Sequence, residues 1–507
     1  MSTDRDQPDI PVRSPSHWLW GPFAGLVFAA IGLGGSMLAQ VRVSPTALGS
    51  AGEITAANLL GGVFLCGWLV WWLVVIRPRQ DTALRGAVAG VLVACLSYPA
   101  VLLLAHLVNT DRGHASDSSL LEQVTQALVQ SLLGLVTTGF ASTIALAVSG
   151  VLIALLQHRL TPYPEVPAGV RPPGVLRRLF HGLVVITLSI VGVLVVGFVV
   201  LTVLPVPPLS GVLTPQPATD YQQALDEFSA IEAREAALPL RPECHSQLRT
   251  HGSKVARVVV YFHGLTSCPA QGDALAQQLF DKGYNVVVPR LPGHGEEDPL
   301  TLALAHMTAE DLVNTANTAI GIAHGVGEDV IIVGLSAGGT VTTYETQQND
   351  TLGNAVAVAP FLGPDFLPPW TTRAATNLLL RAPNLMIWWN SKTPYSSPEM
   401  PYVYPRYATR AVGELMRLGR IVAGEAETRR PAAQGIGVLL NRADKTINAP
   451  LVEQLVREWE KQGAAVDLRF LPLEDGLPHD VIDPRQPHGN INIVYPTLFE
   501  MISATSK

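Results

Sequence analysis

The sequence has few charged residues and few cysteines. Only 15% of its 507 residues are charged, against about 25% in ordinary soluble domains, and its mean hydropathy is +0.28. This composition excludes a disordered chain, a coiled coil and an ordinary cytosolic enzyme. A net charge of −7 gives no indication of nucleic-acid binding. Four cysteines are too few for a disulfide-dense scaffold, and the chain has no HExxH or CxxC pattern, so we predict neither a metal nor a cofactor.

Lysine is missing from the first 204 residues. This part holds 11 arginines and 9 acidic residues, net +2, whereas the remainder holds 23 basic and 32 acidic residues, net −9. Five apolar stretches without a single charged residue lie in the first part, and each has about the 20 residues that a helix needs to cross a bilayer. They are residues 18–38, 56–76, 86–108, 132–156 and 182–204. We therefore predict that residues 1–204 form a five-helix transmembrane region, with the lipid bilayer as its partner.

The arginines predict an orientation for this region. Nine of them fall in the N-terminal segment and the loops on one side, and two, Arg42 and Arg112, fall on the other. Because cytoplasmic loops are enriched in positive charge, the N-terminus is expected in the cytoplasm and everything after residue 204 outside it. The chain is thus expected to be an integral protein of the inner or plasma membrane. Residues 37–39 make a poor signal-peptide cleavage site, which favours a retained first helix.

A second domain is predicted after a short linker. Residues 205–218 contain five prolines, a composition typical of an extended spacer. From residue 219 to residue 507, apolar β-branched runs alternate with amphipathic helical patterns. This alternation predicts a mostly parallel sheet with helices on both faces. The predicted strands are residues 258–262, 284–289, 329–335, 355–359, 437–441 and 466–471.

A serine lies at the end of one predicted strand. Residues 334–338 read Gly-Leu-Ser-Ala-Gly, a G-x-S-x-G pattern that follows an apolar strand and precedes a helical pattern. A sharp turn from strand to helix needs glycines where a side chain would clash. Such a turn lifts the serine hydroxyl above the sheet edge, at the N-terminus of the helix. Ser336 is therefore the candidate nucleophile.

A nucleophilic serine needs a base and a residue that orients the base, because its own hydroxyl is too weakly acidic. Asp444 and His479 each lie just beyond a predicted strand, so Asp444 would fix the tautomer of His479, the general base. Two alternatives stay open. Asp475 could replace Asp444 as the acid, and His488 could replace His479 as the base.

Two backbone N–H groups are needed to bind the oxyanion of an acyl-transfer reaction. Ala337, directly after the nucleophile, is one expected donor. Leu265, in the loop after the strand at residues 258–262, is the other, and Gly264 beside it allows a close approach of the backbone. His263 in the same loop is expected to brace the loop rather than to react.

Three motifs together resemble those of the α/β-hydrolase superfamily. They are HGLT at residues 263–266, PGHG at 292–295 and GLSAGG at 334–339, and they look most like the bacterial carboxylesterase and monoacylglycerol-lipase-like branch. The resemblance covers residues 240–505, about half the chain. It implies an α/β-hydrolase fold with a cap insertion at residues 361–430. The site residues that it implies are Ser336, Asp444 and His479 as the triad, and the Leu265 and Ala337 amides as the oxyanion hole.

The expected cap is rich in aromatic residues and in proline. Its prolines predict irregular structure rather than a regular pair of helices. As a group the aromatic residues indicate an apolar pocket for an acyl chain, although packing of the cap explains any single one equally well. The nine residues are Phe361, Phe366, Trp370, Trp388, Trp389, Tyr395, Tyr402, Tyr404 and Tyr407.

The four cysteines divide between the two parts. Cys66 and Cys95 lie in apolar stretches, where they fit as small packing residues. Cys244 and Cys268 lie in the part expected outside the cytoplasm, where disulfides persist, and we predict a bridge between them. Two buried free thiols are the alternative.

These observations favour a membrane-anchored serine hydrolase. The expected substrates are carboxyl esters with apolar acyl chains, such as monoacylglycerols or lysophospholipids. Fold does not determine chemistry, so a serine peptidase or an acyltransferase is the alternative enzyme. A membrane sensor or scaffold that keeps an inactive hydrolase domain is the non-enzymatic alternative.

Overall fold

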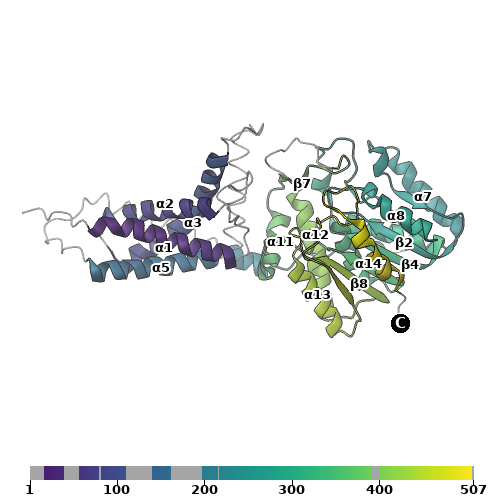
Figure 1. The fold of residues 1–507 in the computed structure, drawn as a ribbon. Helices are drawn as coiled ribbons and strands as arrows, with labels where there is room; N and C mark the ends of the chain where they lie inside the picture. The colour runs from purple at the N-terminus through teal and green to yellow at the C-terminus, as the bar shows by residue number, and fades with distance from the viewer. Residues whose placement is uncertain are drawn as a thin grey trace, which may run out of the picture. The chain divides into compact units, whose positions relative to one another are not determined.

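The chain divides into two compact units, residues 1–198 and residues 199–507 (Figure 1). The structure is a computed structural model. It describes residues 16–38, 56–78, 81–109, 140–161, 197–214, 216–389 and 400–504.

The first unit is helical in its described part. Its helices are α1 (Ser16–Leu38), α2 (Ala56–Trp71) with a π-helical turn at Trp72–Ile76, α3 (Ala83–Asn109) and α5 (Phe140–Leu160). Among the described residues, one segment, Leu59–Ile76, is both long and apolar enough to cross a membrane, with a mean hydropathy of 2.3. Core helices of soluble proteins reach the same length and composition, so the five crossings remain a prediction. The fifth predicted stretch lies outside the described residues as far as residue 196.

Glycines allow helices α3 and α5 to approach closely. A Cβ at Gly86 would lie 2.1 Å from the carbonyl oxygen of Gly150, and one at Gly150 would lie 2.0 Å from that of Gly86. Small residues at facing positions bring helix backbones together in this way, both in membranes and in soluble bundles. A polar contact joins α2 to α5, because Trp71 Nε1 donates to Gln157 Oε1 at 3.1 Å.

The second unit is built on a seven-stranded sheet with the order β1-β3-β2-β4-β5-β8-β9. All neighbours pair in parallel except β1 and β3, which are antiparallel. This confirms the mostly parallel sheet expected from the alternating pattern. The strands are β1 (Gln247–Arg249), β2 (Val255–Phe262), β3 (Asn285–Val288), β4 (Gly327–Leu335), β5 (Asn354–Val358), β8 (Gly435–Asn441) and β9 (Asp467–Leu471).

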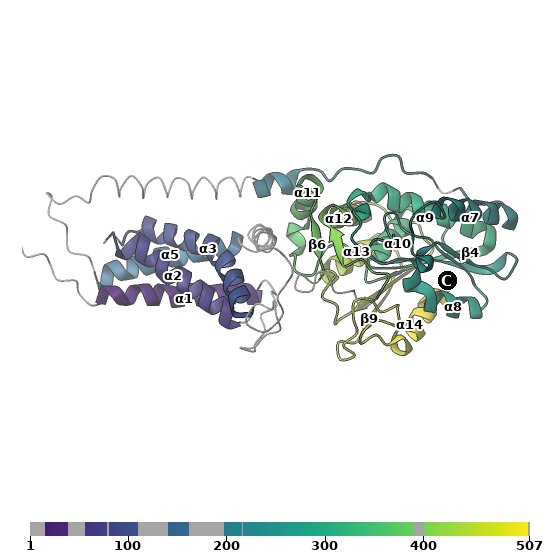
Figure 2. The same cartoon turned by 90° about the horizontal axis from the view of Figure 1, so that it is seen from above.

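Helices cover both faces of this sheet (Figure 2). The central strands are buried on both sides, which explains their uninterrupted runs of Val and Ile. Helix α9 begins at a capping box between Thr308 and Asp311. The helices are α7 (Tyr221–Glu235), α8 (Asp273–Asp281), α9 (Ala309–Val326), α10 (Ala337–Gln348), α13 (Ala449–Lys461) and α14 (Ile491–Ser503).

The insertion between β5 and β8 is more regular than its prolines predict. It contains helices α11 (Thr372–Arg381) and α12 (Thr409–Ala426), which pack against each other, and a two-stranded antiparallel sheet of β6 (Met386–Trp388) and β7 (Arg406–Ala408). The expectation of an irregular cap was therefore wrong for these segments. The prolines fall mainly in the connections, where they do not interrupt a helix.

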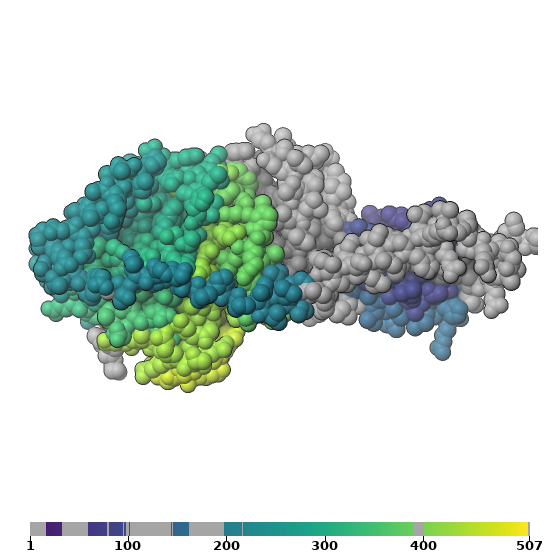
Figure 3. Space-filling model, turned by 180° about the vertical axis from the view of Figure 1, so that it is seen from behind, coloured from purple at the N-terminus to yellow at the C-terminus, as the bar shows by residue number. Residues whose placement is uncertain are grey.

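Part of the proline-rich segment at residues 205–218 is bound to helix α12. Arg417 on α12 donates to the carbonyl oxygens of Pro207 and Pro208 at 3.0 and 2.6 Å, and to Glu310 Oε1 on α9 at 2.6 Å. Figure 3 shows this segment in dark teal, lying across the surface of the unit. The linker role of the segment stays a prediction, but at these two residues a buried arginine satisfies carbonyl groups that an extended chain would leave to water.

A helical segment at residues 197–203 precedes the proline-rich segment, and its end contacts helix α11 of the cap. Asn377 Nδ2 on α11 donates to the carbonyl oxygens of Leu201 and Leu204 at 2.9 and 3.0 Å. Arg373 Nε donates to the Leu204 carbonyl oxygen at 3.2 Å. These side chains satisfy carbonyls that the end of a helix leaves without partners. Helix α11 therefore holds the end of the segment that leads into the α/β unit.

Candidate active site

Ser336 stands at the junction of β4 and α10, in a strained backbone conformation. Its φ is +56° and its ψ is −110°, in a region that residues with a side chain rarely adopt. Hydrogen bonds on both sides hold this conformation. The Ser336 N–H donates to the Val358 carbonyl oxygen at 3.0 Å, and the Phe361 N–H donates to the Ser336 carbonyl oxygen at 3.1 Å. The turn has the form expected for a serine raised above the sheet edge.

Glycines make this turn possible. A Cβ at Gly334 would lie 2.2 Å from the Gly338 carbonyl oxygen, and a Cβ at Gly338 would lie 2.0 Å from the Phe262 carbonyl oxygen. The first turn of α10 can therefore pack directly on the ends of β2 and β4. This is the reason why the G-x-S-x-G pattern was informative.

Asp444 and His479 meet beyond the ends of β8 and β9. His479 Nδ1 donates to Asp444 Oδ2 at 2.6 Å, and the Asp444 side chain is 1% exposed. Burial opposes the charge on Asp444, but the charge and hydrogen bond of His479 and a bond from the Thr446 N–H hold its pKa below the usual value. Burial also opposes a charged His479, yet the Asp444 carboxylate raises the pKa of this histidine above 6.5.

The two alternative residues do not join this pair. Asp475 and His488 are both exposed, and the hydrogen bond of His479 Nδ1 goes to Asp444. The loop between β9 and α14, which carries His479, is called the histidine loop below. It is held from the end of β8, where Asn441 Nδ2 donates to the carbonyl oxygens of Leu477 and Pro478, each at 2.9 Å.

The loop after β2 lies beside the nucleophile. A Cβ at Gly264 would lie 3.6 Å from Ser336 Cβ, so the backbone of this loop approaches the serine directly. The Leu265 and Ala337 N–H groups stay the predicted donors of an oxyanion hole.

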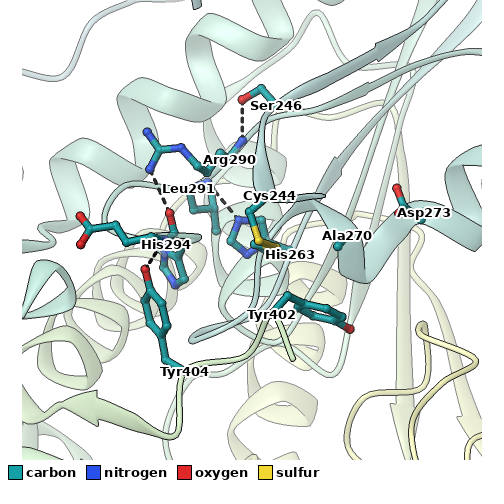
Figure 4. The surroundings of a disulfide bond; sticks show 12 residues. Cys244, Ser246, His263, Ala270, Asp273, Arg290, Leu291, His294, Tyr402 and Tyr404 are labelled. Carbon is teal, nitrogen blue, oxygen red and sulfur yellow. Dashed lines mark hydrogen bonds between the residues drawn. A yellow bond between two sulfur atoms is a disulfide. The ribbon is translucent and has the colours of Figure 1, made fainter. Parts of the chain in front are cut away.

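His263 has the structural role that the sequence indicates. The Leu291 N–H donates to His263 Nε2 at 3.0 Å (Figure 4). The proton of His263 therefore lies on Nδ1, which donates to the Gly264 carbonyl oxygen at 3.0 Å. Burial and the neighbouring His294 hold the pKa of His263 well below 6.5. This histidine is neutral and joins the loop after β2 to the loop after β3.

His479 Nε2 is buried and makes no hydrogen bond within the described residues. The Ser336–His479 hydrogen bond of a working triad is therefore not formed in this structure, as is common without substrate. A chain of polar contacts nevertheless joins the two sides of the site. The Gly264 N–H donates to Gln271 Oε1 at 2.8 Å, and Gln271 Nε2 donates to Asp480 Oδ2, next to His479, at 2.7 Å.

The cap touches the same loop. Trp389 Nε1 donates to Thr266 Oγ1 at 3.0 Å, and the Tyr404 N–H donates to the Thr266 carbonyl oxygen at 2.8 Å. Thr266 has a φ of +65°, so these contacts hold a strained residue directly after Leu265. Sequence reasoning missed these contacts and Gln271, because no local pattern marks polar contacts between distant segments.

The cap aromatics do not form one group. Tyr402 and Tyr404 are 1% exposed and belong to the core, whereas Phe366 and Trp370 are 57% and 58% exposed. Tyr395 lies outside the described residues. The apolar acyl pocket remains a prediction.

Cys244 and Cys268 are joined by a disulfide in the structure (Figure 4). Both cysteines are fully buried, and they pack with Met400 and Tyr402 of the cap. The bridge connects the segment before β1 to the loop that continues from Thr266. Across the described ranges, no group of three or more His, Cys, Asp or Glu side chains could hold a metal ion.

Comparison with known proteins supports the fold. Residues 259–487, under half of the chain, match the family model described as "Alpha/beta hydrolase family". One curated relative is a thermostable monoacylglycerol lipase from Bacillus sp. (strain H-257), 30% identical over 102 residues. That alignment covers 20% of this chain and 39% of the lipase, so it spans well under half of the relative's length.

Solved structures resemble about half of the chain. One of them, from work on LipS and LipT, two metagenome-derived lipolytic enzymes, is 19% identical and covers 51% of this chain and 98% of its own, with a TM-score of 0.40. A soluble variant of monoglyceride lipase from Saccharomyces cerevisiae is 14% identical and covers 50% of this chain and 89% of its own, also with a TM-score of 0.40. The sheet order, the serine turn and the family model together confirm the α/β-hydrolase fold expected for the C-terminal part.

Proposed function

We propose that the α/β-hydrolase unit is a serine hydrolase that cleaves carboxyl esters with apolar acyl chains. The observation that carries the proposal is the combination of a strained Ser336 above the sheet edge with a buried Asp444–His479 hydrogen bond. A serine in this conformation costs folding energy, and such strain is retained mainly at functional sites. The match to the alpha/beta hydrolase family supports the same class of reaction.

The proposed reaction proceeds in two steps. Ser336 Oγ attacks the ester carbonyl carbon, while His479 Nε2 takes the serine proton and Asp444 stabilises the resulting imidazolium. The carbonyl oxygen becomes an oxyanion that the N–H groups of Leu265 and Ala337 bind. The C–O bond breaks, the alcohol leaves with the proton from His479, and an acyl-enzyme remains. Water, deprotonated by His479, then releases the acid and restores Ser336.

We propose monoacylglycerols or lysophospholipids as the substrate class. The name of the Bacillus relative supports a lipid ester, although the alignment covers only part of that protein. Exposed aromatics on the cap, among them Phe366 and Trp370, offer an apolar surface for an acyl chain. A serine peptidase or an acyltransferase on the same fold is the alternative, and an inactive sensor or scaffold is the non-enzymatic one.

We further propose that the protein is anchored in the inner or plasma membrane, with a cytoplasmic N-terminus and the hydrolase unit outside. Support comes from the five apolar stretches, the arginine distribution and the disulfide, since an oxidising compartment favours such bridges. A reporter fused after Lys507 should be active if it requires an extracytoplasmic location. Activity of a reporter that works only in the cytoplasm would reverse the proposed orientation.

A substrate panel tests the proposed reaction. The full-length protein in detergent is assayed on p-nitrophenyl esters of increasing acyl length, the matching anilides, a monoacylglycerol and a lysophospholipid, with Ser336→Ala as control. Ester hydrolysis that exceeds anilide hydrolysis and is lost in the variant supports the proposal. Comparable rates on anilides would favour a peptidase, and transfer to an added alcohol that exceeds hydrolysis would favour an acyltransferase. Absence of all turnover would favour the sensor or scaffold.

A further inference from the structure

Gln271 is a buried polar residue that no part of the proposed reaction uses directly. It lies in the 3-10 turn Pro269–Gly272, between the loop after β2 and helix α8, and is 5% exposed. Burial of an amide side chain costs free energy unless each polar atom finds a partner. The contacts of Gln271 therefore indicate why an amide is placed there.

Both ends of the Gln271 amide are occupied, and its orientation follows from its partners. Gln271 Oε1 accepts from the Gly264 N–H at 2.8 Å and from the Tyr261 hydroxyl at 3.1 Å. Gln271 Nε2 donates to Asp480 Oδ2 at 2.7 Å. A backbone N–H can only donate and the carboxylate accepts, so the two ends of the amide cannot be exchanged.

The Asp480 end is fixed independently of Gln271. Asp480 Oδ1 accepts from the N–H groups of Ile482 and Asp483 at 3.0 and 3.1 Å, and Oδ2 also accepts from Gln486 Nε2 at 3.0 Å. The carboxylate is thus a rigid point within the histidine loop, one residue from His479. Gln271 links this carboxylate to the loop after β2, which carries Gly264 and Leu265 and is called the oxyanion loop below.

The other partner of the Gln271 amide, Gly264, lies beside the proposed nucleophile. Gly264 directly precedes Leu265, the expected oxyanion donor, and a Cβ at Gly264 would lie 3.6 Å from Ser336 Cβ. The direction of the Leu265 N–H depends on the peptide plane that Gly264 and Leu265 share. Gln271 holds the preceding peptide through the Gly264 N–H, and His263 Nδ1 holds the Gly264 carbonyl oxygen at 3.0 Å, so the two bonds together restrict where the Leu265 N–H points.

We propose that Gln271 is a positioning residue that couples the oxyanion loop to the histidine loop, so that both halves of the site keep one spacing. This inference rests on the proposed serine-hydrolase function. The amide spans the two loops with one acceptor and one donor, a pair of roles that a carboxylate or an apolar side chain cannot supply. The coupling acts on the transition state, since only then does an oxyanion occupy the space beside Leu265.

The experiment compares Gln271→Leu, which keeps the volume and removes both bonds, with Tyr261→Phe. The second variant removes the other hydrogen bond to the same Gln271 oxygen without touching either loop. The full-length protein is assayed on p-nitrophenyl butyrate. Turnover is expressed per active site titrated with a fluorophosphonate, so that unfolded protein does not enter the rate.

For Gln271→Leu we expect kcat to fall by about 10- to 100-fold with KM within about twofold, because a misplaced donor weakens transition-state binding alone. Tyr261→Phe is expected to keep kcat within about threefold of the wild type. Gln271→Asn, which is too short to reach both loops, should reproduce the loss of kcat and serves if the leucine variant does not fold. An exposed control, Gln222→Leu on α7, should be unchanged.

Three results would overturn the coupling. Wild-type kcat per titrated site in both Gln271 variants, with only stability reduced, would show a purely structural role. An equal loss in Tyr261→Phe would show that the buried network as a whole matters, not the link between the loops. A rise in KM without a change in kcat would place Gln271 in ground-state binding. If wild-type protein neither reacts with the fluorophosphonate nor hydrolyses the ester, the proposed function itself fails.

Discussion

Gly338 offers a sharp test of how the fold places the nucleophile. It lies in the first turn of α10, two residues after Ser336, where a Cβ would come within 2.0 Å of the Phe262 carbonyl oxygen. Ordinary van der Waals contact begins at 3.4 Å, so the alanine Cβ of Gly338→Ala would lie 1.4 Å too close to this oxygen. The obstructing atoms belong to the backbone of β2 and cannot rotate away. The helix start and the strand end must therefore separate.

The expected cost follows from that separation. Overpacking of a close-packed core typically costs 1–3 kcal/mol, and we expect about 3 kcal/mol here because backbone atoms collide. A shift of about 1 Å between Ser336 and the Gly264 loop would misalign the nucleophile with the oxyanion donors. Misplacement on that scale lowers rates by about 100-fold.

The assay pairs denaturant unfolding with kcat/KM on p-nitrophenyl butyrate. Gly424→Ala on α12 is the matched control, since a Cβ there meets nothing within 4 Å. Alanine in an open helical position should leave kcat/KM unchanged and stabilise by about 0.5–1 kcal/mol. If Gly338→Ala keeps the wild-type midpoint and kcat/KM, the packing of α10 on β2 does not position Ser336, and this part of the reasoning is refuted.

Three further predictions concern charge. The acidic limb of kcat/KM against pH should have its midpoint above 6.5, because His479 must be neutral to act as the base and Asp444 raises its pKa. A midpoint below 6.5 would contradict the pairing of His479 with Asp444. Burial raises the pKa of Glu345 to about 8, above its unfolded value of 4.5, so stability that is present at low pH is lost as pH rises through this window. The free energy of unfolding should therefore fall by up to about 1.4 kcal/mol per pH unit there, and Glu345→Gln should remove that slope in denaturant titrations at several pH values. Arg417→Met should lower the free energy of unfolding by about 3 kcal/mol, because Glu310 and Glu414 lose their partner in a largely buried cluster. Arg429→Met, at an exposed ion pair, should lower it by about 1 kcal/mol or less. Equal losses in the two variants would refute the special role of the cluster.

Much of the α/β unit could be predicted from its sequence because its signals are local. Runs of Val and Ile mark buried parallel strands, and the capping box at Thr308 marks the start of α9. The glycines around Ser336 mark a turn that only small residues permit. The Asp444–His479 pair could be predicted as well, because both residues follow predicted strands.

Other features depend on contacts between distant segments, which no periodicity records. Arg417 binds the carbonyl groups of residues 207 and 208 from some 210 residues further along the chain, so no local pattern predicted these contacts. Gln271 and Asp480 meet across 209 residues, and neither belongs to a recognisable motif. In the helical unit, hydropathy alone does not distinguish a crossing helix from a buried one, so the number of crossings stays a prediction.

Covalent labelling of Ser336 tests the central claim most directly. The full-length protein in detergent is treated with a fluorophosphonate probe and digested, and the peptide that contains residues 334–338 is analysed by mass spectrometry. We predict one adduct per chain on Ser336, no labelling of Ser336→Ala, and at least 100-fold slower labelling of His479→Ala, because the serine then lacks its base. Unlabelled wild-type protein, or labelling that persists in Ser336→Ala, would contradict the account.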